Sequence, residues 1–133
     1  HPYDVYGLPN AAITIVTYGR LFSYACQALF SLREKGLAVS IIKLNRIKPI
    51  PEEALALAAR AEKLFFFEEG VEQGGVGEHF ITALQKGPHV PWCYLRGICG
   101  FVKHASMEES LRELALDPAG MENLIESECG KWQ

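Results

Sequence analysis

The run Leu64-Phe65-Phe66-Phe67 places apolar side chains on both faces of an extended chain. A strand that is apolar on both faces is typical of a largely parallel sheet with helices above and below it, because neither face then meets water. Lys63 leads into the run, and charged residues return at Glu68. This short segment therefore predicts a layered α/β fold.

Two strand–helix units precede the run. Ala12 to Thr17 is rich in β-branched residues and predicts a buried strand. Apolar residues at helical spacing follow it as far as Gly36, where a helix is expected to end. They are Phe22, Ala25, Leu29 and Leu32. Ala38 to Leu44 predicts a second strand, and the next helix is expected from Pro51 to about Glu62.

The segment after the run predicts a loop, a helix and another strand. Glu68 to Val76 is expected to be a glycine-containing loop that leads into a third helix. That helix has an apolar stripe and is expected to end at Gly87-Pro88. Val90 to Leu95 then predicts a fourth strand buried in the same sheet.

Two helices complete the predicted order. Ser106 and Glu109 form a capping box that opens a helix through Leu114, and Asp117-Pro118 caps the last one. The order βαβαβαβ with right-handed crossovers predicts a doubly wound α/β fold. Tyr3 to Leu8 is expected to add a short edge strand, and a single domain fills residues 1–133.

The composition narrows the classes of function. The chain has 133 residues, 49% of them apolar, and its formal net charge of −3 supplies no overall positive field for nucleic acid. No apolar run approaches the roughly 18 residues of a membrane span, so no membrane partner is expected. The four cysteines lack Cys-x-x-Cys spacing and are expected to be free thiols, with no metal site, in a cytoplasmic protein. A chain that begins at His1 is expected to be a fragment or a processed product.

Functional residues of an open α/β sheet are expected beyond the carboxyl ends of its strands. The loops expected to converge there contain Gly19, Lys43 to Lys48, Glu68 to Gly77 and Gly97 to His104. The glycines at 74, 75 and 77 stand ahead of a helix, where they allow close backbone approach and leave amide donors free. We expect Gly74, Gly75 or Gly77 to have a positive φ or no room for a Cβ. This loop is either an anion-binding site or, the favoured interpretation, a tight turn that packs a helix on the sheet.

Two candidate catalytic arrangements lie at the same end of the sheet. Glu68 and Glu69 could divide an acid and a base role, but neighbours in extended chain point to opposite faces. A solvated or hydrogen-bonded loop carboxylate is therefore favoured. His104 lies in a crevice loop without a marked nucleophile, so a hydrolase using Cys99 and His104 is the least favoured interpretation.

The charges are distributed unevenly along the chain. Residues 20 to 48 hold six basic residues against one acidic residue, and Lys43, Arg46 and Lys48 cluster after the second strand. Residues 104 to 133 hold seven acidic residues against two basic ones. The basic cluster is a candidate interface, and the acidic tail is either a solvated helix face or a surface that packs between subunits.

Several segments together resemble the C-terminal domain of the transketolase superfamily, and most closely that of the 1-deoxy-D-xylulose 5-phosphate synthases. The segments are Ile13 to Arg20, Ile47 to Ile50, Glu68 to Gly77, Gly97-Ile98 with Phe101 to Ser106, and Leu116 to Met121. Their order and spacing carry the resemblance across nearly all of the chain. Two departures stand in one loop: Cys99-Gly100 replaces a usual Pro-Asp, and Ala105 replaces a usual glycine.

The resemblance implies a three-layer α/β/α sandwich around a five-stranded, mostly parallel sheet with one antiparallel edge strand, assigned to Tyr3 to Leu8. It implies a parent enzyme that uses thiamine diphosphate and Mg²⁺ to join a two-carbon unit from pyruvate to glyceraldehyde 3-phosphate. That cofactor lies between two preceding domains, so this chain is expected to bind no cofactor and to hold no catalytic residue. Its implied partners are those upstream domains, within a homodimer.

Two alternatives remain open from the sequence. The loop with paired glutamates and Gly-Gly-x-Gly is also similar to the β subunits of 2-oxo acid dehydrogenases, and other transketolases share the fold. A stand-alone regulatory module whose glycine loop binds an anion is the alternative from another class.

Overall fold

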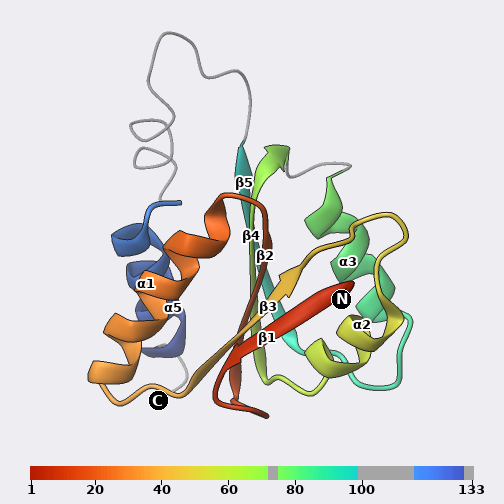
Figure 1. The fold of residues 1–133 in the computed structure, drawn as a ribbon. Coiled ribbons are helices and arrows are strands. Elements are labelled where there is room, and N and C mark those ends of the chain that lie inside the picture. The colour runs from red at the N-terminus through yellow and green to blue at the C-terminus, as the bar shows by residue number, and fades with distance from the viewer. Residues whose placement is uncertain (72–74, 99–115, 131–133) are drawn as a thin grey trace, which may run out of the picture.

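The computed structural model describes residues 1–71, 75–98 and 116–130, which form a sheet with helices packed against it (Figure 1). In chain order the elements are β1 (Tyr3–Gly7), β2 (Ile13–Tyr18), α1 (Leu21–Glu34), β3 (Val39–Leu44), α2 (Glu52–Ala58), β4 (Lys63–Val71), α3 (Val76–Gln85), β5 (Trp92–Ile98) and α5 (Pro118–Gly130). The predicted alternation of strands and helices is confirmed.

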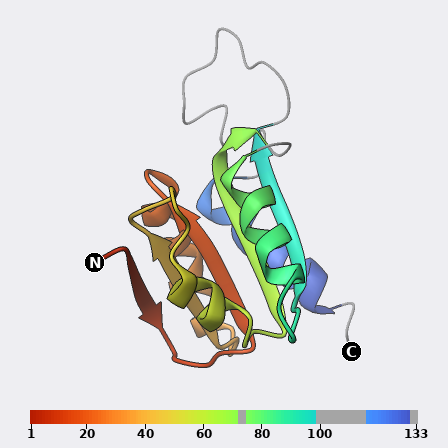
Figure 2. The ribbon, with the colours of Figure 1, turned by 90° about the vertical axis from the view of Figure 1, so that its right-hand side faces the viewer.

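The five strands form one sheet in the order β1-β3-β2-β4-β5. The pairs β3–β2, β2–β4 and β4–β5 are parallel, whereas β1 runs antiparallel to β3 at the edge. Figure 2 shows β1 as the outermost strand on the side of the N-terminus. The five-stranded, mostly parallel sheet with one antiparallel edge strand is therefore confirmed.

The helices cover both faces of the sheet, as the phenylalanine run predicts. Helices α1 and α5 lie on one side of the sheet, and α2 and α3 lie on the other (Figure 1). Phe65 and Phe67 pack in the core with α1 and α5, whereas Phe66 packs in the core with α2 and α3. All three rings are fully buried. Burial of a phenylalanine side chain contributes about 1.5–3 kcal/mol, so this run is a major source of stability on each side of the sheet.

Several predicted boundaries were wrong. Helix α2 ends at Ala58 rather than near Glu62, because the amides of Glu62 and Lys63 bond to the carbonyl of Ala12 and return the chain to the sheet. Strand β5 covers Trp92 to Ile98 and not Val90 to Leu95, and it begins two residues later than predicted because Trp92 pairs with Lys63 where β4 begins.

The largest correction concerns the segment predicted as a loop from Glu68. Strand β4 continues through Val71, and Val71 pairs with Ile98 of β5 after an irregularity that begins beyond Phe67. The extension is compatible with a charged side chain because hydrogen bonds satisfy the buried Glu68 carboxylate.

The C-terminal helix begins where the sequence predicts. Asp117 accepts a hydrogen bond from the Gly120 amide at 2.9 Å, which caps α5. Met121 and Ile125 of this helix are buried in the same core as Phe65. The predicted capping box at Ser106 and Glu109 lies outside the described residues.

Candidate functional site

A buried carboxylate joins three elements at the carboxyl end of the sheet. Glu68 of β4 is 0% exposed. Its Oε2 accepts a hydrogen bond from the Tyr18 hydroxyl at the end of β2 (2.9 Å), and its Oε1 accepts one from the Gly77 amide in the first turn of α3 (3.1 Å). The first-turn amides of a helix have no partner within the helix and carry partial positive charge, so a carboxylate is stabilised there.

Gly77 allows this contact because it lacks a side chain. A Cβ at this position would lie 2.8 Å from both Glu68 Oε1 and Phe66 Cδ1, and it would also collide with Leu95 Cδ1. Real Cβ atoms do not approach other heavy atoms this closely. The expectation that one of the three glycines has no room for a Cβ is therefore confirmed at Gly77.

The other two glycines contribute differently. Gly75 precedes α3 in ordinary extended backbone, with φ −84° and ψ −179°, and its carbonyl accepts a bond from the His79 amide at 3.2 Å. Gly74 lies outside the described residues. Gly19, after β2, has a φ of +65°, which favours glycine at the turn into α1.

Tyr18 is the hydroxyl donor of the site. Burial raises the pKa of its phenol above the usual value, and the hydrogen bond and negative charge of Glu68 raise this pKa further. The hydroxyl therefore stays protonated at neutral pH and donates to the carboxylate. The Tyr18 ring also packs at a tilt against Phe66, with centroids 6.3 Å apart.

The two adjacent glutamates are on opposite sides of β4, as extended geometry predicts. Glu68 faces α3, whereas Glu69 lies near the start of α1, with its Oε1 3.7 Å from Arg20 Nε. The Glu69 side chain is 31% exposed. The two carboxylates are not arranged to share a proton, and the predicted loop carboxylate is corrected to a buried strand carboxylate at Glu68.

Of the predicted basic cluster, Lys43 lies within β3, whereas Arg46 and Lys48 follow the strand, and Lys43 and Arg46 make separate local contacts. Lys43 Nζ lies over the Phe22 ring, 4.7 Å from its centroid, and Arg46 Nε donates to the Pro49 carbonyl at 3.0 Å. Arg46 and Lys48 are exposed. Their role as an interface stays a prediction.

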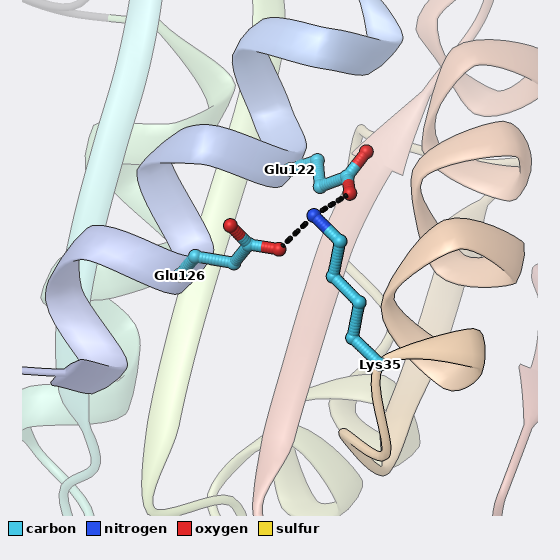
Figure 3. A network of polar contacts seen from close by, with 3 residues as sticks. All are labelled: Lys35, Glu122 and Glu126. Atoms are coloured by element: carbon cyan, nitrogen blue, oxygen red, sulfur yellow. Dashed lines mark hydrogen bonds and ion pairs between the residues drawn. The ribbon is translucent and has the colours of Figure 1, made fainter.

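Part of the acidic tail pairs within the chain. Lys35, just beyond α1, lies between two carboxylates of α5 (Figure 3). Its Nζ is 2.6 Å from Glu122 Oε1 and also bonds to Glu126. These two glutamates of α5 therefore pair with the C-terminal end of α1 in their own chain, which differs from both expectations for the acidic tail, a solvated helix face and packing between subunits.

The structure shows polar contacts at two residues, Tyr18 and Lys63, that were not predicted from the sequence. Tyr18 follows the β2–β4 pair Thr17↔Phe67 in parallel register, so strand pairing would have placed it near Glu68. Lys63 is 2% exposed, with its Nζ on the Glu128 carbonyl and over the Trp92 ring. A charged residue directly before an apolar run gave no signal that it would be buried.

Ligand groups for a metal are not gathered in residues 1–71, 75–98 and 116–130, where no three His, Cys, Asp or Glu side chains come together. The predicted crevice residue His104 and the loop before it lie beyond the described part. Among the helices that the structure describes, none is long and apolar enough to cross a membrane.

Comparison with known proteins gives a consistent result. Residues 8–121 match the family model described as transketolase, C-terminal domain. The chain is 35% identical over 106 residues to 1-deoxy-D-xylulose-5-phosphate synthase of Shouchella clausii, a match that covers 78% of this chain and 17% of the relative. It is 32% identical over 123 residues to the synthase of Synechococcus elongatus, covering 91% of this chain and 19% of the relative. It thus spans less than a fifth of these relatives.

Solved structures show the same fold. A split-gene transketolase, described as an inactive β4 tetramer, superposes with a TM-score of 0.79 at 21% identity, covering 93% of this chain and 41% of the other. The 2-oxoglutarate:ferredoxin oxidoreductase of Magnetococcus marinus superposes with a TM-score of 0.67 at 24% identity, covering 95% and 19%. With the family match over most of its length, the chain belongs to the transketolase C-terminal domain family.

Proposed function

We propose that the chain is the supporting C-terminal domain of a thiamine-diphosphate-dependent 1-deoxy-D-xylulose 5-phosphate synthase, and that it is not catalytic alone. The proposed parent reaction joins pyruvate and glyceraldehyde 3-phosphate to give 1-deoxyxylulose 5-phosphate and CO₂. Two synthase relatives that share 32–35% identity with most of this chain support the assignment. The preceding domains of the parent, in a homodimer, are the proposed partners.

The observation that carries the supporting role is the internal use of the glycine turn. From the sequence, the amides of the glycine turn are possible donors to a bound anion. In the structure, the Gly77 amide donates to the chain's own Glu68 carboxylate. The same carboxylate binds Tyr18, so β2, β4 and α3 are fixed together. A ligand anion at this amide would have to displace a buried carboxylate, which favours a structural turn over the alternative of a stand-alone anion-binding module.

The donor set of the described residues does not fit the proposed parent's Mg²⁺ and diphosphate. Mg²⁺ prefers carboxylate, amide and carbonyl oxygens in octahedral geometry, and no group of three candidate side chains gathers in the described part. Glu68, the most deeply buried carboxylate of the candidate site, already accepts hydrogen bonds on both oxygens. We therefore assign cofactor binding to the other domains of the parent.

Calorimetry tests this division of roles directly. The purified 133-residue chain is titrated with thiamine diphosphate in the presence of Mg²⁺, and product formation from pyruvate and glyceraldehyde 3-phosphate is assayed in parallel. No saturable heat and no product are expected. Saturable binding with a micromolar dissociation constant would contradict the supporting role, because the chain would then hold a cofactor site of its own.

A further inference from the structure

The edge strand β1 is the least covered strand of the sheet. Val5 and Tyr6 point to opposite faces and are 43% and 41% exposed, and Leu8, just beyond the strand, is 43% exposed. The neighbouring strand β3 is almost entirely buried. In the sheet that the described residues form, β1 is the edge strand, and both ribbon views show it at the outer edge (Figures 1 and 2).

The helices leave this strand open on both faces. On the α2 side, a hollow of about 190 Å³ lies beside Val5, between Ile42 and Leu57, because α2 ends at Ala58. On the α1 side, Tyr6 contacts Phe22 at a centroid distance of 4.9 Å but remains partly exposed. Apolar side chains that flank an unpaired edge are typical of an interaction surface.

The hydrogen bonds to β3 define which backbone groups face outward. The Asn45 amide bonds to the Pro2 carbonyl, and the Leu8 amide bonds to the Val39 carbonyl. Antiparallel strands bond at alternate residues, so positions 2, 4, 6 and 8 face β3. The backbone groups of Tyr3, Val5 and Gly7 therefore face the free edge.

This edge has few of the features that prevent strand pairing. Natural edge strands are often protected by lysine, proline or an inward-pointing charge. Strand β1 has the sequence Tyr-Asp-Val-Tyr-Gly, and its one charged side chain, Asp4, accepts a hydrogen bond from Asn45 Nδ2 at 2.8 Å. Asp4 also lies opposite Lys43 in the β1–β3 register.

We propose that a second copy of this chain pairs with β1 in antiparallel register, about a two-fold axis at Val5, so that the two sheets become continuous. In this register each Val5 faces Val5 of the other copy, and Tyr3 faces Gly7, which leaves space for the aromatic ring. The outward amides and carbonyls at these positions are those that an added antiparallel strand would bond.

Charge selects this register over its neighbour. A two-fold axis at Asp4 would place the two Asp4 side chains directly opposite each other, with their Cβ atoms about 4.5–5.5 Å apart, and like charges in such a pair are destabilising. With the axis at Val5, Asp4 instead faces Tyr6, whose hydroxyl can donate to it. One short strand on each side makes a small interface, so the association is weak and depends on concentration.

Backbone hydrogen exchange measured by NMR tests the surface without any mutation. The amides of Asp4 and Tyr6 face β3 and are expected to be protected at every concentration, whereas those of Tyr3 and Val5 gain protection only on association. For a dissociation constant on the order of 0.1 mM, exchange at Val5 slows roughly fourfold between about 10 µM and 1 mM chain. Unchanged exchange at Tyr3 and Val5 would overturn the proposal.

Charge exchange tests the two-fold axis. Val5→Asp and Val5→Lys each place like charges opposite each other and are expected to be monomeric in sedimentation equilibrium, whereas their mixture restores the dimer. Val90→Asp is the matched control, because Val90 is equally exposed but lies before β5, on the other side of the sheet, and this variant is expected to dimerise. Circular dichroism checks the fold of each variant.

The outcomes are separable from those of the proposed function. A wild-type chain that stays monomeric at about 1 mM, or a Val5→Asp and Val5→Lys mixture that fails to associate, would overturn the pairing. Loss of association in Val90→Asp but not in Val5→Asp would move the interface away from β1 and also overturn it. None of these results bears on cofactor binding by the isolated chain.

Discussion

Replacement of Gly77 by alanine tests the packing that the candidate site depends on. The new methyl group would collide with Leu95 Cδ1 and lie 2.8 Å from Phe66 Cδ1 and Glu68 Oε1. Phe66 is fully buried in the core beneath α3, so it cannot move without displacing its neighbours. The helix must therefore shift outward, and the hydrogen bond from the Gly77 amide to Glu68 must lengthen.

Two costs add in this variant. Insertion of a methyl group into a packed core costs about 1–3 kcal/mol. Loss of a partner by a buried polar group costs about 1–3 kcal/mol more. The free energy of unfolding is expected to fall by about 2–6 kcal/mol, and the melting temperature of a chain of this length by roughly 8–24 °C.

Calorimetric or urea unfolding of Gly77→Ala measures this cost, and Gly87→Ala is its control. Gly87 lies just beyond the other end of α3, where a Cβ would be 3.4 Å from the Leu84 carbonyl and the backbone has no positive φ. The control is expected to change the stability by less than about 0.5 kcal/mol. If Gly77→Ala melts within 1–2 °C of the wild type, roughly half a kcal/mol by the same scaling, the close approach is not a determinant of stability and the account of the site is wrong.

Three further predictions test individual contacts. Tyr18→Phe removes the donor to Glu68 and should lower the free energy of unfolding in urea at pH 7 by about 1–3 kcal/mol. Because folding raises the pKa of the phenol, this loss should shrink as the pH rises above about 10. A loss that does not change with pH would contradict this role of the Tyr18 hydroxyl. Lys35→Met removes the cation between Glu122 and Glu126 and should lower the melting temperature at pH 7. Since folding also raises the pKa of Lys35, the difference in melting temperature between the variant and the wild type should vanish well above pH 10.5. An equal difference at pH 7 and well above pH 10.5 would show that the charge of Lys35 does not cause the loss of stability. Burial raises the pKa of the Cys93 thiol from 9.0 to about 11, so its alkylation by iodoacetamide at pH 8 should be roughly a hundredfold slower in the folded chain than in urea, whereas equal rates would refute its burial.

Much of the fold could be predicted because single segments specify it. The three phenylalanines at 65 to 67 alternate between the two cores, which is why an apolar run predicts helices on both faces. Asp117 similarly marks the start of α5, since its carboxylate caps the helix through a local bond to the Gly120 amide. The apolar run and the helix cap each depend on residues that are close together in the sequence, so a short segment is enough to predict them.

The candidate site was less predictable because its contacts join distant residues. Glu68 looks like the start of a loop, and its bonds to Tyr18 and Gly77, which are 50 and 9 residues away, stabilise a buried carboxylate in the strand. Lys63 is a second case, since its Nζ bonds to a carbonyl of α5, 65 residues away. A charged side chain is expected to be exposed unless its hydrogen-bond partner is known. The partners of Glu68 and Lys63 are brought near by the packing of distant segments, which the sequence does not show.

The central claim is that this chain supports a synthase whose cofactor is bound by other domains. The most direct test replaces the matched segment of the Shouchella clausii synthase with this chain and measures 1-deoxyxylulose 5-phosphate formed from pyruvate and glyceraldehyde 3-phosphate. We predict product formation well above that of the same relative with the segment deleted. A folded chimera no more active than the deletion would contradict the claim.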